Sequence, residues 1–131
     1  MRRGLAVGCV LAALVLARAA GSEDKHPGAP TFRTYCAPCH GADGKGEGPR
    51  ADSLRYHPAD LSQIAARNGG SFPFEKVVRI VDGRVPVKGH GAPDMPVWGD
   101  AFKNADARYD DKRVREKIRE VVDYLRTLQA R

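Results

Sequence analysis

The sequence predicts an all-α protein with a single domain. Two stretches, Phe74–Val81 and Val114–Leu128, carry apolar residues at the spacing of one helix face. No run alternates apolar and polar residues between hairpin signals, so little or no sheet is expected. Two segments rich in glycine and proline, 41–49 and 85–99, predict loops between three or four helices. The length of 131 residues leaves room for one domain of ordinary size.

Residues 1–24 have the features of a secretory signal peptide. Arg2 and Arg3 supply a positive start, and residues 5–16 form an uncharged, mostly apolar run. This run is shorter than the roughly 20 residues that span a bilayer, so a removed signal is favoured over a retained membrane anchor.

Cleavage is expected near Ala19–Gly21, because Ala17-Arg18-Ala19 fits the small-x-small rule of signal peptidases. The mature domain would then occupy 25–131, and Cys9 would be discarded. The net charge would fall from +6 to +3 with the loss of three arginines. Basic and acidic residues are interspersed along the rest of the chain, so nucleic acid is not an expected partner.

The first helix is expected over 30–39. Its apolar or anchoring side chains, among them Phe32 and Tyr35, are three and four positions apart, and Pro30 suits a first turn. The glycine-rich segment 41–49 that follows must be a loop, which lets the backbone pass close to something bulky.

Two further helical segments are expected before residue 84. Asp60–Ala66 suits a short helical stretch, ended by the glycines that follow Asn68. Ser71 offers an N-cap for the helix that contains Phe74, and Gly83 stands where a C-terminal glycine cap belongs.

The segment 85–99 reads as a long loop, and long loops without regular structure are usually functional. The final helix is expected to begin near Asp110 or Asp111. Its apolar stripe consists of Val114, Ile118, Val121, Val122, Leu125 and Leu128. These helices supply few apolar side chains, so a large, flat, apolar cofactor would help to fill the interior.

The motif Cys36-Ala37-Pro38-Cys39-His40 predicts covalent haem attachment. Two cysteines at this spacing on a helix can meet the two vinyl groups of a haem, and the next residue can present its imidazole to the iron. A thioredoxin-like redox pair is the first alternative, but it belongs beside a strand. A zinc site is the second, and it would need His57 or His90 as its fourth ligand.

Together with Gly48-Pro49 and Asp94-Met95-Pro96-Val97-Trp98-Gly99, this motif makes residues 30–129 resemble the bacterial class I cytochromes c. The resemblance implies the cytochrome c fold, with three to four helices wrapped around one covalently bound haem c. It implies Met95 as the second axial ligand, and Met95 is the only methionine after the expected signal. It also implies that the carbonyl of Pro49 accepts a hydrogen bond from the proximal imidazole.

Other residues are weaker candidates for the haem environment. Trp98 could pack on the haem or reach a propionate with its indole N–H, or be an ordinary partly buried aromatic residue. Arg50, Arg55 and Tyr56 are further candidates for the propionates. His90 is a rival ligand, but a solvated loop histidine is favoured. The remaining histidines, His26 and His57, are expected to be solvated or structural.

Iron with both axial positions filled has no vacant site for oxygen or peroxide, so the expected function is one-electron transfer in the periplasm, with no enzymatic activity. A thioether ligand predicts a positive reduction potential. Arg79, Arg84 and Lys88 could steer redox partners with acidic docking faces, or form a solvated surface. The alternatives are a subunit or dedicated acceptor of a periplasmic dehydrogenase or oxidase complex, an open-site enzyme or gas sensor, and a haemless disulfide protein.

Overall fold

The computed structural model describes residues 25–85 and 94–130. The expected signal peptide, His90 and Lys88 lie outside these ranges. The described residues are helical and contain no strand, which confirms the all-α prediction. None of their helices is both long and apolar enough to cross a membrane. The elements are α1 (Ala29–Thr31), η2 (Phe32–Cys36), α2 (Ala37–His40), η3 (Ala51–Ser53), η4 (Leu61–Gln63), α3 (Ile64–Arg67), α4 (Phe74–Asp82), α5 (Trp98–Ala105) and α6 (Asp111–Thr127).

The first helical segment runs without a break through α1, η2 and α2, where a single α-helix over 30–39 was expected. Its middle part, η2, is a π-helix, and the amide of Ala37 donates to the carbonyl of Phe32. Pro38 accounts for the wider turn, because its ring clashes with the carbonyl four residues earlier in an α-helix and it has no N–H to donate. The π turn ends at Cys36, so it sets the direction of the cysteine pair.

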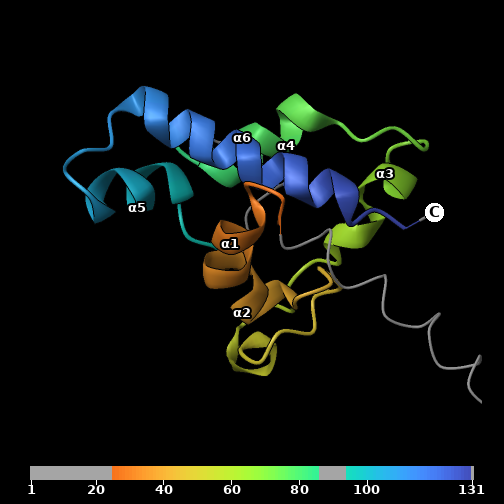
Figure 1. Cartoon of the computed structure of the whole chain (residues 1–131). Coiled ribbons are helices and arrows are strands. Elements are labelled where there is room, and N and C mark those ends of the chain that lie inside the picture. Colours follow the sequence, from red (N-terminus) through yellow and green to blue (C-terminus); the bar gives the residue numbers. More distant parts are fainter. Residues whose placement is uncertain (1–24, 86–93, 131) are drawn as a thin grey trace, which may run out of the picture.

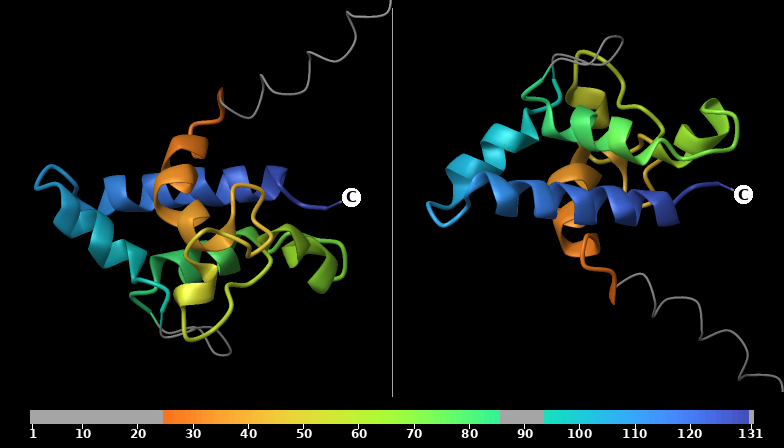
Figure 2. Two further views of the ribbon diagram at one scale, coloured as in Figure 1. Left: turned by 90° about the horizontal axis from the view of Figure 1, so that it is seen from below. Right: turned by 90° about the horizontal axis from the view of Figure 1, so that it is seen from above.

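This segment crosses the long helix α6, as both views of Figure 2 show. At the crossing the backbone of Gly28 lies so close to Glu120 that a Cβ on Gly28 would overlap the Glu120 carbonyl. Beside it, the fully buried ring of Phe32 lies 5.3 Å from the ring of Tyr124. The close approach buries the start of α1 against the centre of α6.

Helix α6 supplies many of the buried core residues, and it begins where the sequence predicts. Asp110 is its N-cap, and the Asp110 side chain accepts a hydrogen bond from the amide of Arg113 at 2.8 Å. The predicted apolar stripe is buried as far as Leu125, while Leu128 is only partly buried. Helices α1, α4 and α5 all pack against α6 (Figure 1).

Helix α4 packs on α6, and its residues Val77 and Val81 are buried. The expected cap at Ser71 is wrong: Pro73 occupies the N-cap position and makes no side-chain capping hydrogen bond. Gly83 ends the helix with φ of 71°, in the left-handed conformation that a glycine cap requires.

Helix α5 was not predicted, because the expected loop extended to residue 99. The sequence does not indicate this short helix, because Pro96 precedes it and Gly99 is its second residue, and both residue types are typical of loops. The buried ring of Phe102 stacks on Trp98 at 5.4 Å and anchors α5 to the core. Tertiary packing therefore stabilises a helix that periodicity alone does not reveal.

The short helical stretch expected over Asp60–Ala66 is confirmed as η4 followed by α3. Asp60 is the N-cap of η4, where its carboxylate accepts from the amide of Ser62 at 2.9 Å. Between His40 and Asp60 the backbone is irregular apart from turns and the short helix η3.

Candidate functional site

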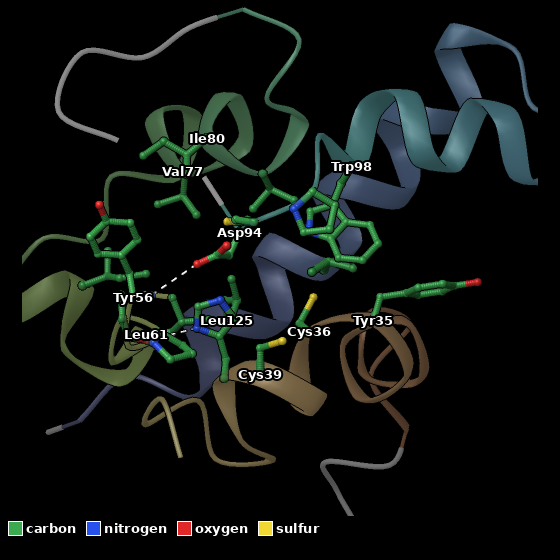
Figure 3. A pocket seen from close by; sticks show the side chains of 18 of the residues that line it. Tyr35, Cys36, Cys39, Tyr56, Leu61, Val77, Ile80, Asp94, Trp98 and Leu125 are labelled. Atoms are coloured by element: carbon green, nitrogen blue, oxygen red, sulfur yellow. Dashed lines mark hydrogen bonds between the residues drawn. The ribbon is translucent and has the colours of Figure 1, made fainter. Parts of the chain in front are cut away.

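An apolar cavity of about 460 Å³ lies beside α6, between the segment that carries Cys36 and helix α4 (Figure 3). Its volume is in the range of ligand and cofactor sites. Its aliphatic walls are formed by Leu61, Ile64, Val77, Ile80, Val81, Val121 and Leu125.

Cys36 and Cys39 both line this cavity, and both are free thiols. Figure 3 shows their sulfur atoms on the same side of the helical segment. Burial, and to a lesser extent the neighbouring Cys39, raises the pKa of Cys36 to about 12. Cys36 is therefore a protonated thiol at neutral pH, held against an apolar wall.

His40 lines the same cavity, and its imidazole is held by the backbone of a distant residue. The Nδ1 atom lies 3.0 Å from the carbonyl oxygen of Ala59. A carbonyl can only accept, so Nδ1 carries the proton and Nε2 of the neutral ring keeps its lone pair. Burial lowers the pKa of His40, although the hydrogen bond to Ala59 acts in the opposite direction. The neutral imidazole is the form that binds a metal.

The carbonyl of Pro49, expected to accept from this imidazole, does not do so in the structure, where Ala59 takes that place. The loop that ends at Pro49 instead runs back along α2. The amide of Gly46 donates to the carbonyl of His40 at 2.7 Å, and the amide of Gly48 donates to that of Cys39 at 3.0 Å. The loop thus satisfies the C-terminal carbonyls of α2, while Pro49 is exposed and is not among the residues that line the cavity.

Met95 lines the cavity from the segment that precedes α5, and it packs against the core. Trp98 also lines the cavity, and its ring lies 5.6 Å from that of Tyr35. The structure thus brings Met95 and His40 to one cavity although 55 positions separate them in the sequence.

The polar residues at the cavity differ in part from those expected. Tyr56 lines it, whereas Arg50 and Arg55 are exposed and do not. Three residues that the sequence analysis missed also line the cavity, namely Arg67, Asn68 and Lys76. Only the fold brings α3 and α4 to the cavity, so no local sequence signal marks these residues.

The other described histidines have separate surroundings. His57 is exposed and contributes to the cavity lining. His26 is structural, because its Nε2 lies 3.2 Å from a carboxylate oxygen of Asp123 on α6. Within the described ranges, no three His, Cys, Asp or Glu side chains are grouped so that they could hold a metal ion.

A family model described as Cytochrome c matches residues 26–129, so the chain belongs to the cytochrome c family. No curated protein and no solved structure gives a significant match to the chain. Membership makes the protein an electron-transfer haem protein, an electron carrier with redox partners, and its cofactor is covalently bound haem c.

The residues of the cavity fit such a group. Two free thiols three positions apart and an imidazole come from one helical segment, and a thioether comes from another. The walls between them are aliphatic, as a porphyrin face requires. The cysteine pair fits the spacing for haem attachment.

Proposed function

We propose that the protein is an exported one-electron carrier of the periplasm. In this proposal Cys36 and Cys39 hold haem c, His40 is the proximal iron ligand and Met95 is the distal ligand. The observation that carries the proposal is that these four side chains line one cavity.

Each residue has a definite part in this proposal. The hydrogen bond from Nδ1 to Ala59 fixes the orientation of His40 and raises the basicity of Nε2. The thioether of Met95 would hold the iron together with His40, would favour its ferrous state and would keep external ligands from binding. The aliphatic walls exclude water and disfavour the additional charge of the ferric state. Haem iron supplies the one-electron chemistry by changing between its ferric and ferrous states.

The visible spectrum of protein produced in a host that attaches haem c tests the axial ligands. We expect a sharp reduced c-type spectrum and, in the oxidised protein, the weak long-wavelength band of a thioether bound to ferric iron. High-spin ferric iron without that band would contradict Met95 as a ligand.

A pair of variants sharpens this test. Met95→Leu should abolish the band and allow carbon monoxide to bind the ferrous protein. Val97→Leu is the matched control, because Val97 is 41% exposed and lies outside the cavity lining. This control should keep the band and exclude carbon monoxide. Carbon monoxide binding to the wild-type protein would favour an open-site sensor or enzyme.

Export and the oligomeric state need separate measurements. The mass of the mature protein should correspond to cleavage near Ala19–Gly21, and an intact N-terminus in the purified protein would contradict a removed signal. A free carrier should elute as a single chain. Stable co-purification with a dehydrogenase or oxidase would instead assign the protein as a subunit or dedicated acceptor.

A further inference from the structure

Asp94, the residue before Met95, is hydrogen-bonded to the backbone segment that also contacts His40. A carboxylate oxygen of Asp94, Oδ2, accepts a hydrogen bond from the backbone amide of Tyr56 at 3.2 Å (Figure 3). Both residues line the cavity, although 38 positions separate them. The hydrogen bond therefore joins two segments that are distant in the sequence.

The segment that contains Tyr56 is well suited to serve as a fixed support. Three residues after Tyr56, the carbonyl of Ala59 accepts the hydrogen bond from His40. Pro58 restricts the backbone of the residue before it to extended conformations. The segment also packs so tightly on the preceding loop that a Cβ on Gly46 would lie 2.5 Å from the Pro58 carbonyl oxygen.

Met95 is also anchored on its other side. Pro96 has a restricted φ, and α5 begins at Trp98, whose ring stacks on the buried ring of Phe102. The core thus holds the chain that follows Met95, and the hydrogen bond to Tyr56 holds Asp94, the residue directly before it.

We propose that Asp94 is a positioning residue for Met95. Its hydrogen bond to the Tyr56 amide keeps the thioether against the iron by fastening the methionine segment to the same short stretch that orients His40. This inference rests on the proposed role of Met95 as distal ligand. A neutral thioether binds iron weakly enough to be displaced by imidazole, so the restraint on Met95 affects how easily it is displaced.

The test is a titration of the ferric protein with imidazole, followed by loss of the thioether band. Asp94→Ala removes the acceptor, and we expect half-displacement at an imidazole concentration about tenfold lower, the scale of one hydrogen bond to a charged group. Asp94→Asn removes the charge but keeps an oxygen acceptor, so its midpoint should stay within about threefold of the wild type. Asp52→Ala removes an exposed carboxylate outside the cavity lining and should leave the midpoint unchanged.

A second measurement follows the hydrogen bond itself. In the ferrous protein, hydrogen exchange of the Tyr56 amide should be slow in the wild type and in Asp94→Asn, and about tenfold faster in Asp94→Ala. This readout and the far-ultraviolet circular dichroism separate a local effect from a general loss of the fold.

The outcomes distinguish this inference from the proposed function. A wild-type protein without the thioether band would overturn both. If the wild type has the band but Asp94→Ala titrates like it, the positioning role alone is wrong. Equal effects of Asp94→Asn and Asp94→Ala would also overturn it, because the charge of Asp94 and not its hydrogen bond would then control displacement.

Discussion

The Nδ1 atom of His40 and the carbonyl oxygen of Ala59 lie 3.0 Å apart, although the two residues are 19 positions apart in the sequence. This contact selects the tautomer of His40 in which Nε2 can bind iron. It also makes His40, the proposed proximal ligand, depend on the backbone around Pro58. Substitutions that touch this segment should therefore change the electronic properties of the iron as well as stability.

Gly46→Ala tests this dependence. Gly46 has φ of 90°, and a Cβ there would lie 2.5 Å from the Pro58 carbonyl oxygen. We expect the free energy of unfolding to fall by about 3 kcal/mol, from backbone strain and crowding together. Displacement of the segment should weaken the hydrogen bond from His40, lower the basicity of the ligand and raise the reduction potential.

Gly69→Ala is the control for backbone strain alone. Gly69 has φ of 66°, but nothing lies within 4 Å of its Cβ position. Denaturant unfolding should show a loss of about 1 kcal/mol, and voltammetry should show an unchanged potential. Equal shifts of potential in both variants would contradict a specific link between Gly46 and His40.

Gly28→Ala should be strongly destabilising for a different reason. The φ of Gly28 is −78°, which any residue adopts, so the cost comes only from crowding. Its Cβ would overlap the carbonyl of Glu120 and push α1 away from α6. We expect a loss of about 3 kcal/mol or more in the free energy of unfolding. A loss below about 1 kcal/mol would show that the helix crossing can relax.

An ion-pair network at Arg84 predicts a dependence of stability on pH. The Arg84 guanidinium donates to both carboxylate oxygens of Asp82, at 2.7 and 2.8 Å, and to Asp111 at 2.8 Å. Hydrogen bonding to Arg84 lowers the pKa of Asp82 below its ordinary value of 3.8. A lowered carboxylate pKa stabilises the fold above the ordinary value, and this contribution is lost as the pH falls through the lowered pKa.

Asp82→Asn should therefore lower the free energy of unfolding by about 1–2 kcal/mol at pH 7. The difference from the wild type should shrink as the pH falls below about 3.8. Glu116→Gln is the matched control, because Glu116 is 59% exposed and its ion pair with Lys112 on the same helix is long, at 3.8 Å. This variant should unfold almost like the wild type. A difference for Asp82→Asn that is constant with pH would exclude the ion pair as its cause.

Because of this network, a different set of residues is expected to contact redox partners. Arg84 is engaged with Asp82 and Asp111, so it is less suited to steer an acidic partner. Lys76 is exposed and borders the cavity, so its charge lies beside the proposed haem site. It takes the place of Arg84 in the steering hypothesis.

Lys76→Gln should slow electron transfer to an acidic partner at low ionic strength and reduce the dependence of the rate on salt. Stopped-flow kinetics over a range of salt concentrations measures both effects. Lys112→Gln is the control, since Lys112 is 78% exposed, lies outside the cavity lining and pairs with Glu116 at 3.8 Å. Equal effects of the two substitutions would point to net charge and not to a local docking face.

Local sequence patterns predicted several parts of this protein correctly. The stripe on α6 follows from its spacing, and the cap at Gly83 follows from the need for a left-handed residue. The cysteine pair with His40 identified the haem attachment motif, and the match over residues 26–129 confirms the family. Patterns of this kind can be recognised in a sequence because periodicity, glycine conformation and covalent attachment depend on residues that are close together in the chain.

The sequence by itself thus determined the helical class, the final helix and the haem-binding motif. Only the tertiary structure decided that Ala59, and not Pro49, accepts from His40, and that Arg67 and Lys76 border the cavity. It also decided that a helix begins at Trp98. The physical reason is that every residue has a backbone carbonyl, so no side-chain pattern marks the one that meets an imidazole. A short helix likewise depends on packing partners that are distant in the sequence.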